Sequence, residues 1–199
     1  MGDENRFKIR GSIQIGKNDK MINLKKNFVL DDVVFINFLN LDKKEKEMVR
    51  NWRNHHDIRR WMYSNDIISR GEHIKFIKGL KEDNKNFYWL VKNKDGRCVG
   101  IIYLNRVDFN NKNAFLGIYS NPDCKLSGVG HLLIKCLKKL AFDTVQLHTL
   151  KLEVISNNKK AISFYQKSGF SEEGQLKEFV SRDKKWDDMV IMGIINRDS

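Results

Sequence analysis

A short loop, Lys125-Leu-Ser-Gly-Val-Gly130, follows a predicted strand and precedes a predicted long helix. Glycines in such a loop allow positive φ angles and close backbone approach, so several N–H groups can point at one anion. The following helix adds the positive end of its dipole, which favours phosphate or pyrophosphate. An ordinary glycine turn before a helix would have the same sequence. The loop is neither a Walker A loop nor a dinucleotide fingerprint, because no Gly-Lys-Ser/Thr follows and G-x-G-x-x-G is absent.

Capping signals and apolar periodicity predict the helices of the domain that would carry this loop. Two capping-box patterns, Asp42 with Glu45 and Ser69 with Glu72, predict helices over 43–54 and from 70 onward. A long helical pattern follows the loop over 132–141, and a further helix over 159–167 ends before a glycine in the C-cap position. The helix that starts at 70 is expected to bury one apolar stripe. That stripe consists of Ile74, Ile77 and Leu80.

The remaining elements read as short strands. Asp95-Gly96 between two β-prone runs is a strong hairpin signal. The predicted strands are Val33–Leu39, Phe87–Val91, Cys98–Leu104, Phe115–Tyr119, Leu150–Ile155, Phe170–Val180 and Trp186–Ile194. We find no internal repeat and no second boundary, so we predict one mixed α/β domain.

Two motifs together resemble the GCN5-related N-acetyltransferase superfamily. Its acetyl-CoA motif reads Gln/Arg-x-x-Gly-x-Gly/Ala, then a strand, then an Asn-x-x-Ala-x-x-Phe-Tyr-x-x-x-Gly-Phe helix. The first pattern is matched by Lys125, Gly128 and Gly130, with Lys in place of Gln or Arg. The second is matched at every position, by Asn158, Ala161, Phe164, Tyr165, Gly169 and Phe170. The resemblance implies a single-domain fold with a mixed, mostly antiparallel sheet, a splayed central strand pair and flanking helices.

The same resemblance implies where acetyl-CoA would bind. Its pyrophosphate would lie on the 125–130 loop, with Lys125 adding charge. Its pantetheine arm would lie between the splayed strands Phe115–Tyr119 and Leu152–Ile155, where its amides can bond as an added strand would. Asn158 would orient the cosubstrate, or cap its helix, or both. The implied binding residues are Lys125, Ser127, Gly128, Val129, Gly130, Asn158, Ile155 and Phe164.

In this superfamily an amine attacks the thioester directly within a ternary complex, so no cysteine nucleophile is needed. Tyr165 occupies the position of the general acid, and its reference pKa near ~10 keeps it protonated at neutral pH. The alternative interpretation of Tyr165 is an aromatic core residue of an amphipathic helix. Glu153 is the only acid in the strand beside the cosubstrate and is the candidate general base, through a bridging water. Its alternative is a solvent-facing position at a strand edge.

The acceptor is suggested by the segment Arg53–Ser64, which is rich in arginines and aromatic residues. Arginines suit a diphosphate by bidentate hydrogen bonding, and aromatic faces suit a base or sugar ring. An amphipathic helix with a solvated basic face would have the same composition. Together with Leu116-Gly-Ile-Tyr119 and Leu152-Glu-Val, the segment resembles the bacterial pseudaminic-acid biosynthesis N-acetyltransferases.

That second resemblance implies acetylation of the 4-amino group of UDP-4-amino-4,6-dideoxy-N-acetyl-altrosamine, a precursor of the sugar that decorates flagellin. The implied nucleotide-sugar residues are Arg53, His73, Tyr119 and Trp61. For His73, a partly exposed helical position is the alternative. Acetylation of a ribosomal-protein N-terminus is a second reading within the superfamily.

The chain has 199 residues with 37 Lys+Arg against 25 Asp+Glu, a formal net charge of +12. Such an excess suits nucleic acid, an anionic membrane surface, or an anionic cofactor or substrate. Residues 1–20 are polar and without period. We read them as a leader or non-native remnant peripheral to a domain over 21–199, with Met21 as an alternative start.

Other classes of protein have weaker support. A nucleic-acid-binding module rests on net charge alone, since no helix-turn-helix, zinc-finger or RRM signature is present. No run of ~18 apolar residues and no apolar signal core occur, and the three cysteines form no disulfide framework, so we expect a cytoplasmic protein without a membrane partner. The histidines show no metal-ligand spacing, and we predict no metal. An open strand edge is compatible with a homodimer.

Overall fold

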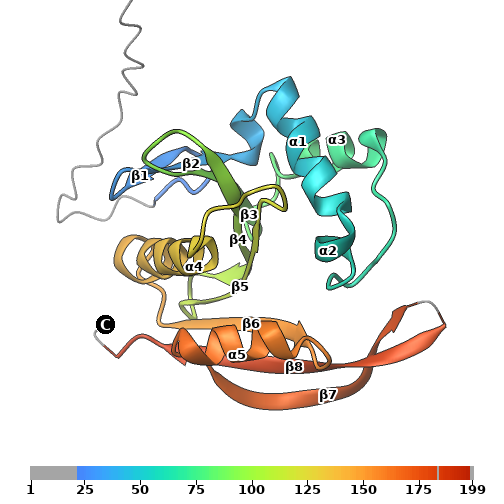
Figure 1. Ribbon diagram of the computed structural model, residues 1–199. Coiled ribbons are helices and arrows are strands. Elements are labelled where there is room, and N and C mark those ends of the chain that lie inside the picture. Colours follow the sequence, from blue (N-terminus) through green and yellow to red (C-terminus); the bar gives the residue numbers. More distant parts are fainter. Residues whose placement is uncertain (1–21, 183, 198–199) are drawn as a thin grey trace, which may run out of the picture.

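The structure is a computed structural model that describes residues 22–182 and 184–197 (Figure 1). The predicted leader lies outside these ranges. The described chain forms one eight-stranded sheet in the order β1-β2-β3-β4-β5-β6-β8-β7. All neighbouring strands are antiparallel except β5 and β6. The strands are β1 (Phe28–Leu30), β2 (Val33–Asn37), β3 (Phe87–Lys92), β4 (Cys98–Asp108), β5 (Asn113–Ser120), β6 (Thr149–Ile155), β7 (Ser171–Arg182) and β8 (Lys185–Ile195).

In the described part of the chain five α-helices flank the sheet, and two of them begin with the predicted capping boxes. The backbone N–H of Glu45 donates to Asp42 Oδ1 at 2.8 Å, and that of Glu72 donates to Ser69 Oγ at 3.2 Å. Both boxes are closed by the reciprocal bond, so two otherwise unsatisfied donors are paired at each helix start. The helices are α1 (Lys43–Asn54), α2 (His56–Arg59), α3 (Arg70–Gly79), α4 (Val129–Lys139) and α5 (Lys159–Lys167). A 3-10 helix spans Phe38–Asn40, and a π-helical turn, Leu140–Thr144, extends α4.

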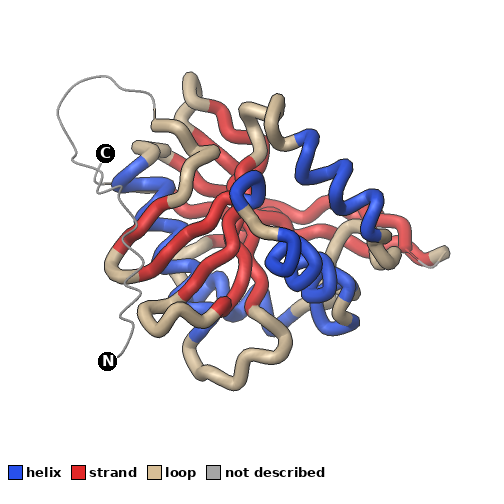
Figure 2. The backbone as a smooth tube through the Cα atoms, turned by 90° about the horizontal axis from the view of Figure 1, so that it is seen from above, coloured by secondary structure: helices blue, strands red, loops and turns tan. Residues whose placement is uncertain are grey.

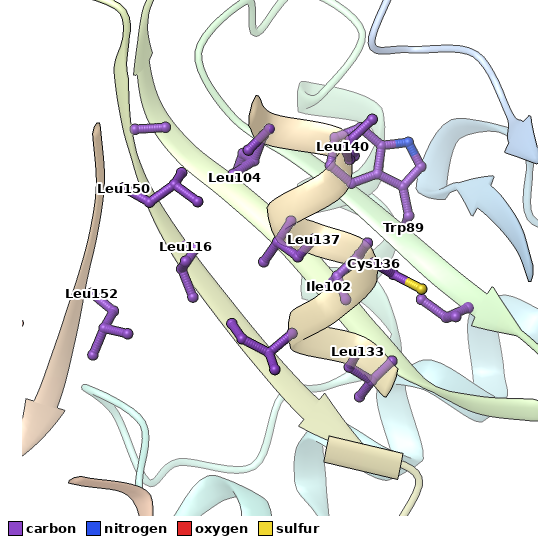
Figure 3. Packing of buried hydrophobic residues seen from close by; sticks show 14 of the residues in the cluster. Trp89, Ile102, Leu104, Leu116, Leu133, Cys136, Leu137, Leu140, Leu150 and Leu152 are labelled. Carbon is purple, nitrogen blue, oxygen red and sulfur yellow. The ribbon is translucent and has the colours of Figure 1, made fainter. Parts of the chain in front are cut away.

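The sheet separates two hydrophobic cores, and β3 shows how. Its side chains alternate, so Trp89 faces α4 while Leu90 faces α1 and α3. On the first side, Leu133, Leu137 and Leu140 from the α4 region pack onto the sheet (Figure 3). Each of these leucines is fully buried and stabilises the fold by about 1.5–3 kcal/mol. Figure 1 shows α4 on one side of the sheet and α1 and α3 on the other.

The central pair of strands is splayed. β5 pairs with β6 only between Asn113–Phe115 and Thr149–Lys151. Beyond that point β5 stays paired to β4 as far as Ser120, and β6 stays paired to β8 as far as Ile155. The outer neighbours therefore hold the two strand ends apart. In Figure 2 the sheet is strongly twisted, and the β7–β8 hairpin extends away from the rest of the molecule. β7 is an exposed edge strand, of the kind that a homodimer would need.

Two expectations from the sequence need correction, and two short elements were missed. The first long strand ends at Asn37, because the Asn37 side chain accepts from the Leu39 N–H at 3.0 Å and caps a 3-10 helix. Ile74 is 39% exposed, so its place in the buried stripe was wrong; His73, at 6%, takes it. The short elements β1 and α2 were not predicted, because three or four residues are too few to show a hydrophobic period.

Burial of His73 leads to a pH-dependent stability. Burial lowers the pKa of His73 in the folded protein, and the nearby charge of Arg50 acts in the same direction. The unfolded chain therefore binds a proton at a higher pH than the native state, so stability falls as the pH drops below about 6.5. We expect the urea midpoint to fall further between pH 7.5 and 5.5 in the wild type than in a His73→Leu variant. Equal falls in both proteins would contradict this assignment.

Candidate functional site

A cleft of about 700 Å³ opens where β5 and β6 separate. Its walls come from the free ends of these strands, from α5, and from the segment that follows α2. The residues predicted for the site that line it are Glu153, Tyr165, Gly130, Asn158, Ile155, Phe164, Tyr119 and Trp61. The structure therefore brings most of the predicted donor and acceptor residues to one opening, although they lie up to about 100 residues apart in the chain.

The loop before α4 has the geometry expected of an anion site. Gly128 is the N-cap of α4 with φ +76°, a left-handed conformation that favours glycine. No side chain caps this helix end and its first turn carries no acid, so its N–H groups are open to a ligand. Gly130 matters for a second reason, since a Cβ there would lie 3.3 Å from the Phe164 ring. The loop residues Lys125, Ser127 and Gly128 are exposed, and Val129 is buried beneath them.

Tyr165 reaches the cleft from α5. Its ring is 8% exposed and packs edge-to-face against Phe164 and Phe170. Burial raises the pKa of the phenol above its ordinary value, so it stays protonated at neutral pH. Among the described residues no hydrogen bond engages its hydroxyl, which leaves the proton available to a ligand. Asn158 at the start of the same helix both accepts from the Ala161 N–H at 3.2 Å and lines the cleft.

Glu153 faces the cleft from β6, with a side chain that is 13% exposed. Arg106 Nη2 and the Tyr63 hydroxyl each contact its Oε2 at 2.7 Å. Its Oε1 has no partner in the described part of the chain. The carboxylate is thus fixed in position while one oxygen remains able to take up a proton. Burial raises the pKa of Tyr63, and donating this hydrogen bond to the Glu153 carboxylate raises it further.

Arg106 and Tyr63 were not predicted as site residues. Arg106 has a φ of +52° where the β4–β5 register shifts, and its guanidinium lies 3.5 Å from the centroid of the Phe115 ring. No local pattern marks such a position, because the irregularity depends on pairing with β5. Tyr63 lies within the aromatic segment after α2, but its partner is 90 residues away.

Two predicted acceptor residues lie outside the cleft lining. His73 is buried on α3 beside Phe76. Arg53 projects from α1, and its Nη2 donates to the Ser64 carbonyl at 3.0 Å. Its Nη1 is buried without a hydrogen-bond partner among the described residues, and burial lowers the pKa of the guanidinium. The Tyr119 phenol, which lines the cleft, acts on the pKa of Arg53 in the opposite direction to burial.

One close contact shapes the floor of the cleft. Tyr103 on β4 is the cross-strand neighbour of Gly117 on β5 and stacks on Tyr88 at 5.1 Å. Its ring leans over Gly117, where a Cβ would come within 2.0 Å of the ring. Burial raises the pKa of Tyr103 to about 12, so its hydroxyl enters the cleft neutral. Gly117 therefore provides the space that this ring occupies.

The comparisons with known proteins agree with this geometry. Residues 41–191 match the family model described as an acetyltransferase (GNAT) domain. The chain belongs to the GNAT acetyltransferases. It is therefore an enzyme that transfers an acetyl group, and enzymes of this family take that group from acetyl-CoA. The single-domain fold with a splayed central pair, expected from the two motifs, is confirmed.

Two kinds of acetyltransferase are among the proteins similar to this GNAT protein. Acetyltransferase PseH of Campylobacter jejuni is 35% identical over 143 residues, which is 72% of this chain and 87% of that protein. Its crystal structure covers 82% of this chain and 98% of its own, with a TM-score of 0.63 and 26% identity. A Vibrio cholerae spermidine N-acetyltransferase, solved in complex with CoA and spermine, covers 83% of this chain and 96% of its own, with a TM-score of 0.74. At 22% identity this second likeness shows the fold alone.

The described ranges contain neither a candidate metal site nor a candidate membrane-spanning helix. Across residues 22–182 and 184–197, no group of three or more His, Cys, Asp or Glu side chains is placed to hold a metal ion. Over the same ranges no helix is both long enough and apolar enough to cross a bilayer.

Proposed function

We propose that this protein is an N-acetyltransferase of pseudaminic acid biosynthesis, which acetylates the 4-amino group of a UDP-linked 4-amino-4,6-dideoxy-N-acetyl-altrosamine. The observation that carries the proposal is its 35% identity to Acetyltransferase PseH over most of both chains. The product would serve flagellin glycosylation, and the reaction would take place in the cytoplasm. The proposed partners are acetyl-CoA, the UDP-amino sugar and, at the β7 edge, a second copy of the chain.

The donor would enter from the α4 side. The open N–H groups of the loop around Gly128 would hold the pyrophosphate, with Lys125 adding charge from the exposed face. The pantetheine arm would occupy the space between the unpaired ends of β5 and β6, where strand-like hydrogen bonds are available. Asn158, Ile155 and Phe164 line this part of the cleft.

The acceptor amine would attack the carbonyl carbon of the thioester, so that a C–N bond forms and the C–S bond breaks. Glu153 would take the amine proton through a bridging water, at the oxygen that has no partner. Tyr165 would give its proton to the departing thiolate, which needs a neutral phenol beside the sulfur. The raised pKa of Tyr165 and the fixed position of Glu153 support these roles.

The charge of the acceptor side supports an anionic substrate rather than a polyamine. A polycation needs uncompensated carboxylates. Glu153 is paired with Arg106, and Arg60 lines the cleft directly. The remaining acid of the cleft lining, Asp57, lies in the same arginine-rich segment. Spermidine is therefore the poorer acceptor on electrostatic grounds, although spermidine acetyltransferases share the fold.

The proposal is tested by thiol release from acetyl-CoA with three acceptors: the UDP-4-amino sugar, spermidine, and a ribosomal-protein N-terminal peptide. We expect kcat/KM for the sugar to exceed that for either other amine by at least about 100-fold. NMR of the product should show acetyl on the nitrogen at C4. Faster turnover of spermidine or of the peptide would reject the substrate while leaving the acetyltransferase assignment intact.

A further inference from the structure

A second pocket, of about 520 Å³, lies between the segment that follows α2 and the far end of the β7–β8 hairpin. These two parts of the chain are more than 100 residues apart, and Figure 1 shows the hairpin extending beyond α2. Arg182 on the hairpin ties them together, since its Nη1 donates to the Arg60 carbonyl at 2.6 Å. The pocket is therefore braced by hydrogen bonds between its two walls.

The pocket is strongly basic. Its lining carries four cationic side chains, Arg59, Arg60, Arg182 and Lys185, against the single carboxylate of Asp187. Arg182 neutralises this carboxylate with its Nε at 3.1 Å and its Nη2 at 2.5 Å from Asp187 Oδ2. The formal charge of the lining is therefore +3, with the lining histidine counted as neutral. A formal +3 in one concave site favours a polyanion.

Two of these cations are available to a ligand. Arg59 donates to the Asn65 carbonyl at 2.6 Å, so its guanidinium is bonded to another residue of the pocket lining. The side chains of Arg60 and Lys185 make no hydrogen bond or ion pair within the described ranges, although the Arg60 carbonyl accepts from Arg182. The guanidinium of Arg60 lies 4.7 Å from the centroid of the Trp61 ring, which orients its planar fork without using its N–H donors.

Arg60 also lines the catalytic cleft, so the two cavities share a wall. A ligand whose amine lies near Glu153 would reach the basic pocket alongside Arg60, the residue that lines both cavities. The other end of the cleft, at Gly130 and Asn158, is where the donor would bind. The anion that belongs to the basic pocket is therefore carried by the acceptor.

We propose that the pocket between Arg60 and Lys185 binds the diphosphate of the acceptor nucleotide while the amine lies in the cleft. This inference rests on the proposed function and names the residues that hold the anionic part of the substrate. It differs from the expectation based on Arg53, because that guanidinium bonds the Ser64 carbonyl and lies outside both cavity linings. The same chemistry would suit the phosphates of CoA, and the experiment separates the two sources.

The experiment is calorimetric titration of UDP, inorganic pyrophosphate and CoA into the full chain and its variants. We expect Arg60→Gln and Lys185→Gln each to raise the Kd for UDP and for pyrophosphate about tenfold and to leave that for CoA within twofold. Lys184→Gln is the matched control, because Lys184 lies on the same hairpin, is exposed and does not line the pocket. Thermal unfolding would confirm that the variants fold.

Three results would overturn the inference. They are no UDP binding by the wild type, an unchanged Kd for UDP in both pocket variants, and a raised Kd for CoA in these variants without a raised Kd for UDP. The proposed function can fail independently of this inference. If UDP binds with the expected dependence on Arg60 and Lys185 but the UDP-amino sugar is not acetylated, the pocket stands and the acceptor is another nucleotide.

Discussion

Replacement of Tyr165 by phenylalanine is expected to lower kcat for acetyl transfer by about 10²–10³-fold. In the proposed mechanism this phenol gives its proton to the departing thiolate, so its loss would leave the thiolate without a proton. KM for acetyl-CoA should stay within about twofold, because the ring and its packing against Phe164 and Phe170 are retained. The measurement is steady-state thiol release over a range of acetyl-CoA concentrations.

The control for this variant is Tyr88→Phe. Tyr88 is a half-buried tyrosine whose pKa, like that of the buried Tyr165, is raised by burial, but it does not line the cleft. We expect its kcat to remain close to that of the wild type. A Tyr165→Phe enzyme that retains more than a third of the wild-type kcat would exclude Tyr165 as the general acid, and attention would turn to the other phenols of the cleft, Tyr103 and Tyr119.

Replacement of Gly117 by alanine is expected to destabilise the protein by about 1–3 kcal/mol, with a parallel loss of activity. The new methyl group would fall within 2.0 Å of the Tyr103 ring, and that ring is already stacked on Tyr88. Either the ring or β5 must move, and both border the cleft. Urea unfolding gives the stability change, and thiol release gives the loss of activity.

A double-mutant cycle with Tyr103→Ala isolates this contact. Removing the ring relieves the clash, so the double variant should lose less stability than the sum of the two single variants. Gly174→Ala is the matched strand control, because a Cβ at Gly174 meets nothing within 4 Å. Its stability should change by less than about 0.5 kcal/mol. Strict additivity of Gly117→Ala and Tyr103→Ala would show that the ring does not limit this position.

Much of the fold could be predicted because its signals are local. The helix over 43–54 has the predicted bounds, and its capping box joins residues only three apart. The helix over 159–167 is equally well predicted, with Gly169 at φ +93° just beyond its end. Ile74 shows the limit of such reasoning. Its spacing fits a buried stripe, but which side of a short helix faces the core depends on what packs against it.

The candidate site also has one part that local motifs predicted and one part that they did not. Of the residues that the motifs predicted for the donor half, Gly130, Asn158, Phe164 and Tyr165 line the cleft, whereas Lys125, Ser127, Gly128 and Val129 do not. The acceptor half was less predictable. Arg53 and His73 do not line the cleft, whereas Arg60, from the same arginine-rich segment as Arg53, lines both cavities. Composition marks that segment as basic but does not say which of its arginines faces the opening.

The sequence by itself determined the family, the order of the longer elements and the loop and helix on which acetyl-CoA would bind. Each of these depends on residues close together in the chain, whose caps, turns and periodicity follow from local backbone chemistry. Only the tertiary structure decided that Glu153 is held by Tyr63 and Arg106, that Tyr103 leans over Gly117, and that the hairpin closes a basic pocket beside α2. These contacts join distant segments, and the register and splay of the sheet fix which side chains meet.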